Sequence, residues 1–143
     1  LKMPVDMRFI EMMPMYDSGD FSPESFISAD TVLERLAGRD LEKVSKDGGV
    51  AELYHIPGAL GNIGLIRPVS AHFCGECNRL RLTSDGKIKP CLHSSDEYSL
   101  KGLDKEGMTE VFKAAILGKP QWHGVLSYDN RSQANRNMNQ IGG

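Results

Sequence analysis

The chain has 143 residues, of which 40% are hydrophobic and 25% are charged, and these are ordinary proportions for a globular protein with an apolar core. The formal net charge is −2 and the cationic residues form no basic stripe, so the composition argues against a nucleic-acid partner. No apolar run approaches the ~20 residues that a membrane span needs, so we also expect no association with a membrane.

The first predicted element is a strand over residues 7–13, in which Phe9 and Ile10 are apolar and Met13 precedes a proline that ends strand pairing. Residues 1–4 contain neither an initiator methionine nor the apolar core of a signal peptide, so we expect a fragment of a longer protein. The residues that follow the strand predict a loop, because Asp, Ser, Gly and Pro gather there.

A helix and a strand pair come next. Ser28 predicts the N-cap of a helix that runs to about Ala37, with Gly38 at its C′ position. Residues 53–56 and 62–69 predict two strands on either side of a Pro-Gly turn.

A second helix is predicted near the C-terminal end. Thr109 predicts its N-cap and Gly118 its end, and the expected buried side comprises Val111, Phe112, Ala115 and Ile116. Together these elements predict an α+β fold of antiparallel β-hairpins with flanking helices.

All three cysteines of the chain, Cys74, Cys77 and Cys91, lie in one stretch with the spacing of metal ligands. Their odd number argues against a disulfide framework and favours a reducing compartment, so we expect a cytoplasmic protein. Three thiolates are one short of the usual four ligands. An iron–sulfur cluster held by three thiolates leaves one iron open to bind something else, whereas a zinc site would recruit a histidine.

The segment between the last two cysteines predicts a β-hairpin. Residues 79–83 alternate between polar and apolar side chains, and Ser84-Asp85-Gly86 forms a turn. A two-residue loop would place Cys91 opposite Leu80, on the apolar side of the hairpin. A three-residue loop with Gly86 in the left-handed conformation shifts the register by one residue.

The three-residue loop is favoured because it pairs apolar residues with apolar ones. Leu82 then faces Ile88, Arg81 faces Lys89 and Arg79 faces Cys91. This register gathers Cys91, Arg79, Arg81 and Lys89 on one face, which Cys77 is expected to join. Arginine forks suit phosphate oxygens, so a metal with an open position beside them predicts a nucleotide site. The alternative for the two arginines is a solvated strand face.

At this point three motifs resemble one family in the same order along the chain. Residues 73–83 (FCGECNRLRLT), with Asp85-Gly86-Lys87 and Pro90-Cys91-Leu92, are similar to the C-terminal cluster motif of the GTP 3′,8-cyclase family. These are the radical S-adenosylmethionine enzymes of molybdenum cofactor biosynthesis. Residues 8–14 (RFIEMMP) resemble a late barrel strand of that family, and residues 141–143 (IGG) resemble its double-glycine tail.

The resemblance implies a function for each motif. Cys74, Cys77 and Cys91 would hold a second [4Fe–4S] cluster, whose unique iron would meet the guanine of GTP. Arg79, Leu80 and Arg81 would bind GTP, mainly through the two guanidinium groups. Met13 would contact S-adenosylmethionine, and Gly142 and Gly143 would reach into the active site. The full enzyme would convert GTP to 3′,8-cyclo-7,8-dihydro-GTP and form a homodimer.

One part of the family pattern is missing. The family's first cluster uses a CxxxCxxC motif to cleave S-adenosylmethionine, and this sequence contains no such motif. The chain therefore resembles roughly the last two-fifths of the enzyme. Residues 1–22 would be the last strand region of an incomplete barrel, and residues 23–143 the cluster and GTP-binding domain. We expect the isolated chain to be inactive, with no catalytic residue of its own.

Two alternatives remain at this stage. His72 or His93 could complete a Cys₃His zinc site that only stabilises a small binding module, although such histidines are more often polar surface residues. The chain could also be a metal-free product of fragment expression. Lys89 is by itself more often solvated than ligand-binding, and Met12, Met13 and Met15 are by themselves more often core residues.

Overall fold

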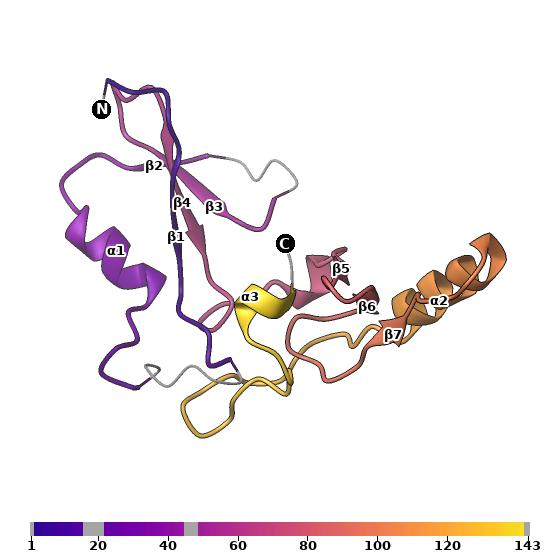
Figure 1. Cartoon of the computed structure of the whole chain (residues 1–143). Coiled ribbons are helices and arrows are strands. Elements are labelled where there is room, and N and C mark those ends of the chain that lie inside the picture. Colours follow the sequence, from indigo (N-terminus) through magenta and orange to yellow (C-terminus); the bar gives the residue numbers. More distant parts are fainter. Residues whose placement is uncertain (1, 16–21, 45–48, 142–143) are drawn as a thin grey trace. The chain divides into compact units, whose positions relative to one another are not determined.

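The computed structural model describes residues 2–15, 22–44 and 49–141. These residues form an α+β structure with two small sheets and few helices, as the sequence predicts (Figure 1). Their contacts divide them into two compact units, one of residues 2–12 and 22–73 and the other of residues 13–15 and 74–141. No helix in this described part of the chain is long and apolar enough to cross a membrane.

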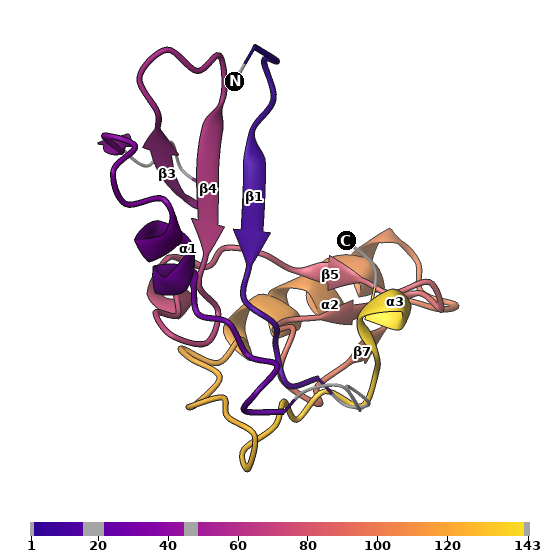
Figure 2. The same cartoon turned by 90° about the vertical axis from the view of Figure 1, so that its left-hand side faces the viewer.

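A four-stranded sheet forms the first unit. Its strands in spatial order are β1 (Met7–Ile10), β4 (Asn62–Ile66), β3 (Glu52–His55) and β2 (Glu42–Val44). Strand β1 runs parallel to β4, as Figure 2 shows, and β3 is antiparallel to both of its neighbours. The predicted first strand and strand pair are therefore confirmed, although β1 and β4 end earlier than predicted.

Helix α1 (Ala29–Arg35) in the same unit begins where the sequence predicts. Ser28 is its N-cap, and the Ser28 hydroxyl accepts a hydrogen bond from the N–H of Thr31 at 3.4 Å. The helix ends earlier than predicted, because Leu36 is its C-cap. Gly38 consequently lies at the second position beyond the cap and not at C′.

The buried carboxylate of Glu11 holds the loops that follow β1 and β4. It accepts hydrogen bonds from the backbone N–H groups of Ala29 at 3.0 Å, Val69 at 3.1 Å and Ser70 at 2.9 Å, and from the Ser70 hydroxyl at 2.5 Å. A carboxylate can accept about four such bonds, so its capacity is filled by these donors. One side chain thus ties the start of α1 and the loop after β4 to the end of β1.

The second unit carries an antiparallel sheet of three short strands with a helix against it. The strands are β5 (Arg81–Leu82), β6 (Lys87–Lys89) and β7 (Tyr98–Ser99), and α2 (Lys105–Leu117) packs against β6 and β7. Two short helices, η1 (Cys74–Glu76) and α3 (Met138–Ile141), lie before and after this sheet in the sequence. A small core consists of Met15, Ala134 and Ile141, and Met13 and Leu92 pack against it.

Helix α2 differs from its prediction at its start and on its buried side. Its N-cap is Asp104, whose carboxylate accepts a hydrogen bond from Gly107 N–H at 2.8 Å, whereas Thr109 lies inside the helix. Of the expected buried side only Ala115 is fully buried, while Phe112 is 41% and Ile116 56% exposed. The strands that it packs against are only two or three residues long, and they cover a narrow side of a helix of 13 residues.

Candidate functional site

The hairpin between Cys77 and Cys91, here called the cysteine hairpin, has the register that the sequence predicts. Arg81 lies opposite Lys89, and Leu82 lies opposite Ile88. The ladder is shorter than predicted, because β5 begins only at Arg81. The apolar pair is also unequally covered, since Ile88 is 2% exposed and Leu82 58% exposed.

The turn of the hairpin is the predicted three-residue loop. Gly86 has a φ of 76°, in the left-handed region, and its N–H donates to the carbonyl of Thr83 at 3.0 Å. The Thr83 N–H in turn donates to the carbonyl of Lys87 at 2.9 Å, which closes the loop. A left-handed glycine at the end of a three-residue loop lets the two strands keep their pairing.

The three cysteines are unpaired and half-buried, and all belong to the second unit. Cys74 opens η1, and the N–H of Cys77 donates to the carbonyl of Cys74 at 3.1 Å, so the two residues share one tight turn. Burial by itself would raise the pKa of the Cys77 thiol. Hydrogen bonds from Arg79 and the charges of Lys119 and Arg79 outweigh it and lower this pKa below its ordinary value.

Electrostatics connect these cysteines to the arginines. Burial lowers the pKa of the Arg81 guanidinium, the charge of Arg79 lowers it further, and the sulfurs of Cys77 and Cys91 raise it. The thiols of Cys77 and Cys91 and the guanidinium of Arg79 therefore lie within electrostatic range of Arg81. The predicted pairing of Arg79 with Cys91 lies beyond the observed ladder, which ends at Arg81 and Lys89.

Three free thiols, two of which lie near cations, are ligands of the type that iron–sulfur clusters use. Among residues 2–15, 22–44 and 49–141, however, no three Cys, His, Asp or Glu side chains lie close enough together to hold one metal ion. The thiolates of a four-iron cluster bind different irons, so they lie further apart than the ligands of a single ion. The assignment of the three cysteines as metal ligands stays a prediction.

Lys89 and His93 are buried, against the expectation that such residues lie at the surface. Lys89 is 0% exposed, and its ammonium donates to the carbonyl of Ser94. His93 is 6% exposed, its Nδ1 lies 3.1 Å from the Ser132 hydroxyl, and its ring centroid lies 4.5 Å from that of His123. Burial and then the neighbouring cations and His123 lower the pKa of His93 to about 4, so its ring is neutral at pH 7.

One cation of the site, Lys119, belongs to no motif that the sequence analysis identifies. Lys119, just beyond the end of α2, donates from its Nζ to the carbonyl of Arg79 at 2.8 Å and to that of Pro90 at 2.7 Å. These partners stand 40 and 29 residues away in the sequence. The only local sign is that a lysine stands between the glycine and the proline that end the helix.

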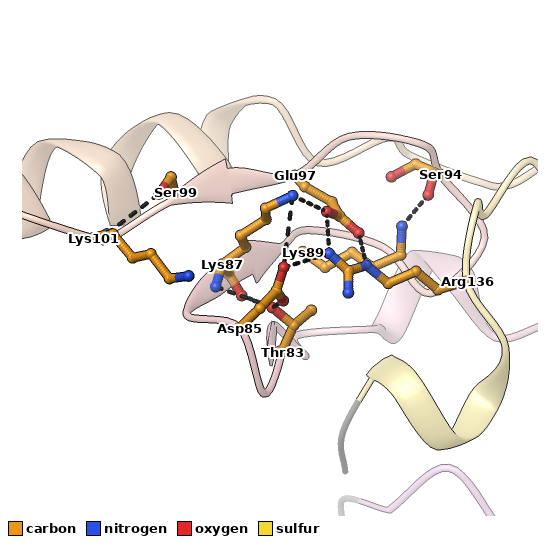
Figure 3. Close-up of polar contacts among 9 residues, drawn as sticks. All are labelled: Thr83, Asp85, Lys87, Lys89, Ser94, Glu97, Ser99, Lys101 and Arg136. Atoms are coloured by element: carbon orange, nitrogen blue, oxygen red, sulfur yellow. Dashed lines mark hydrogen bonds and ion pairs between the residues drawn. The ribbon is translucent and has the colours of Figure 1, made fainter.

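An ion network binds the C-terminal segment to the cysteine hairpin (Figure 3). Arg136 donates hydrogen bonds to the Glu97 carboxylate from Nε, at 2.5 Å, and from Nη2, at 2.8 Å. The same Nη2 also donates to Oδ2 of Asp85 in the hairpin turn, at 2.8 Å. Lys87 reaches Glu97 at 2.9 Å from the other side. The hydrogen bond from Arg136 is the largest of the effects that lower the pKa of Glu97 to about 2 and that of Asp85 well below its ordinary range.

Two of the remaining predicted site residues lie in the described part of the chain. Leu80 is half-buried and directly precedes β5. Met13 packs against the core of Met15, Ala134 and Ile141, so its predicted contact with S-adenosylmethionine stays a prediction. Gly142 and Gly143 lie outside the described residues, although the residue before them, Ile141, is fully buried.

Comparison with known families gives a match over most of the chain. A family model described as Molybdenum Cofactor Synthesis C matches residues 5–125. This range includes the whole cysteine hairpin and Lys119.

Individual relatives agree with this match. The chain is 44% identical to a GTP 3′,8-cyclase of Alkaliphilus oremlandii, over 98% of the chain and 44% of that protein. It is 40% identical to the GTP 3′,8-cyclase of Alkaliphilus metalliredigens, over 98% of the chain and 44% of that protein. For a GTP 3′,8-cyclase of Listeria monocytogenes the identity is 39%, over 97% of the chain and 45% of that protein. The chain thus spans less than half the length of these relatives.

Proposed function

The chain belongs to the Molybdenum Cofactor Synthesis C family, and from this premise we propose that it forms the part of a GTP 3′,8-cyclase that holds an iron–sulfur cluster and orients GTP. Cys74, Cys77 and Cys91 would bind a second [4Fe–4S] cluster. The guanidinium groups of Arg79 and Arg81, with the intervening Leu80, would bind the nucleotide. When bound, the cluster would supply an iron with an open coordination position for the guanine.

One observation supports this proposal most directly. Arg81 pairs with Lys89 in the hairpin and lies within electrostatic range of Cys77, Cys91 and Arg79. Guanidinium groups suit phosphate oxygens, because their planar forks donate two parallel hydrogen bonds. Thiols and arginines in one hairpin would therefore supply ligands for a metal and for an anion side by side.

The other half of the reaction would come from outside this sequence. The full enzyme would convert GTP to 3′,8-cyclo-7,8-dihydro-GTP, with S-adenosylmethionine as the radical source. The sequence given contains no CxxxCxxC motif for that chemistry, so we propose that it is inactive alone. Met13 would contact S-adenosylmethionine, and Gly142 and Gly143 would enter the active site.

The wider architecture follows the same proposal. Residues 1–22 would close an incomplete barrel, and residues 23–143 would form the cluster and GTP-binding domain. The full enzyme would act as a homodimer in the cytoplasm, where unpaired cysteines stay reduced.

The test is anaerobic reconstitution of the full chain with iron and sulfide. We expect a broad absorption band near ~400 nm and about four irons per chain, as for a [4Fe–4S] centre. One colourless zinc per chain, retained in the presence of excess iron, would reject the cluster and favour the Cys₃His module.

A further inference from the structure

Lys119 bridges the two sides of the cysteine hairpin. Its ammonium donates to the carbonyl oxygens of Arg79 and Pro90, at 2.8 and 2.7 Å. Arg79 follows Cys77 by two residues, and Pro90 directly precedes Cys91. The ammonium therefore fixes one backbone point beside each of two proposed cluster ligands.

The hairpin needs such a bridge beyond the end of its strand pairing. Its strand pairing ends at Arg81 and Lys89, and the next residue on the returning strand, Pro90, has no N–H to extend the ladder. Pro90 is also fully buried, so its carbonyl needs a donor from the protein. Lys119 supplies this donor and joins the strands where backbone pairing has stopped.

The end of α2 explains why a lysine arrives at this place. A Cβ on Gly118 would lie 2.6 Å from the Tyr98 hydroxyl, so glycine lets the end of the helix lie close against β7. Pro120 prevents the helix from continuing. Residue 119 consequently leaves α2 beside the hairpin, and the long stem of a lysine carries its ammonium to the two carbonyl groups.

We infer that Lys119 is a positioning residue of the metal centre, which holds Cys77 and Cys91 at the spacing that a cluster requires before the cluster binds. This inference rests on the proposed function, since it takes the cysteines as cluster ligands. The competing role is a general structural one, in which Lys119 stabilises the fold without any particular effect on the cysteines.

The experiment uses the full chain and three variants. Lys119→Met removes the charge and the donors at similar length, and Lys119→Arg keeps a cation with several donors. Lys113→Met is the matched control, because Lys113 lies in α2, which Lys119 follows, and its Nζ pairs with the exposed Glu110 at 2.8 Å. All four proteins are reconstituted with iron and sulfide, and the rate of iron release to a chelator is measured. Backbone hydrogen exchange of the metal-free proteins is measured in parallel.

We expect Lys119→Met to release iron about 10–100-fold faster than the unmodified chain, as changes beside metal ligands typically weaken binding by this factor. Hydrogen exchange should speed up at residues 78–82 and 89–92 and nowhere else. Lys119→Arg should release iron at a rate between those of Lys119→Met and the unmodified chain. Lys113→Met should release iron at the rate of the unmodified chain.

Three results would overturn the inference. If Lys119→Met equals Lys113→Met in both measurements, Lys119 has no effect on the cysteines. If Lys119→Met loses its circular dichroism signal as a whole, Lys119 has the general structural role. If the unmodified chain binds no cluster, the proposed function fails and hydrogen exchange alone decides on Lys119. In that case unchanged exchange in the hairpin would reject its positioning role, and faster exchange confined to the hairpin would support it.

Discussion

The cationic side chains of the cysteine hairpin differ in how much of their charge is available to a ligand. Lys89 is fully buried and its ammonium donates to the carbonyl of Ser94, so it serves the fold of the loop that follows Cys91. Arg79 is exposed and Arg81 is half-buried beside the thiols. Lys87, a further cation of the hairpin, pairs with Glu97 at 2.9 Å.

The first prediction concerns these arginines. Replacing Arg79 or Arg81 by alanine should weaken GTP binding by ~1.5–3 kcal/mol per lost charge-assisted contact. The measurement is calorimetric titration with GTP of the complete enzyme of which we propose this chain is a part. The melting temperature of Arg79→Ala should change little, because Arg79 is exposed and surface substitutions usually alter stability by less than about 0.5 kcal/mol. Arg35→Ala, at the end of α1, is the control and should leave GTP affinity unchanged. Unchanged affinity together with lower melting temperatures would make Arg79 and Arg81 structural.

The second prediction concerns the cysteines. Each single change of Cys74, Cys77 or Cys91 to alanine should abolish retention of the cluster, because three ligands leave none to spare. Iron and sulfide per chain give the readout. His93→Ala should keep the metal, because the proposed cluster is held by the three cysteines and His93 is not one of its ligands. Loss of metal from His93→Ala would instead favour the Cys₃His zinc site, and full iron content in a cysteine variant would remove that cysteine from the site.

At the scale of elements, the turn of the cysteine hairpin carries the third prediction. Gly86 has a φ of 76°, and a Cβ at this position would meet only the Lys101 side chain, at 3.6 Å. Gly86→Ala should therefore lower the free energy of unfolding by about 1 kcal/mol through backbone strain alone. Gly86→Asn should cost less, because asparagine tolerates the left-handed region. Gly75→Ala, which meets no atom within 4 Å and has no positive φ, is the control for denaturant unfolding. Equal stability of Gly86→Ala and Gly75→Ala would contradict the argument.

The elements that the sequence predicts correctly are those with local causes. The hairpin register follows from a two-residue alternation and from a glycine in the turn, both within residues 79–91. The start of α1 follows from one N-cap serine. The predicted start of helix α2 is wrong, because Asp104 and Thr109 are both acceptable N-caps. In the structure Asp104 is the cap, and its carboxylate accepts a hydrogen bond from the Gly107 N–H. Local chemistry alone does not rank two such candidates.

The parts of the site that the sequence could not predict depend on distant residues. The imidazole of His93 pairs with a hydroxyl 39 residues further along, and Lys119 reaches backbone groups 29 and 40 residues earlier. A pattern of neighbouring residues contains no information about such partners. For this reason the sequence can propose residues for the chemistry of the site, whereas their distant partners are known only from the structure.

At the scale of the whole molecule, the unit that carries the cysteines is assembled from segments far apart in the sequence. Met13 and Met15 come from the N-terminal region, and Ala134 and Ile141 come from the other end of the chain, yet they share one core. Arg136 adds an ionic connection from the same C-terminal segment to Asp85 and Glu97. The position of the C-terminal segment relative to the hairpin therefore depends on a small apolar core, on Arg136 and on the contact between Ser132 and His93.

This dependence gives the fourth prediction, which concerns acid. The native pKa of Glu97 is lowered from 4.5 to about 2, first by the hydrogen bond from Arg136 and also by the one from Lys87. A carboxyl group whose pKa is lower in the folded state stabilises that state above its unfolded pKa, and this contribution is lost as the pH falls through the folded pKa. The free energy of unfolding should therefore fall as the pH drops from about 4.5 to about 2. The lowered pKa of Asp85 acts in the same direction.

Arg136→Gln isolates this contribution from all other carboxyl groups of the chain. Without the guanidinium, the native pKa values of Glu97 and Asp85 move toward their ordinary values, so the variant should be less stable at pH 7 and its stability should fall less on acidification. Denaturant unfolding at a series of pH values between 7 and about 2.5 provides the measurement, with Lys113→Met as the control for loss of an exposed ion pair. The stability curves of Arg136→Gln and the unmodified chain should approach each other as the pH falls. Parallel curves would mean that Arg136 holds the C-terminal segment by packing of its side chain, and that its charge contributes nothing to the connection with the hairpin.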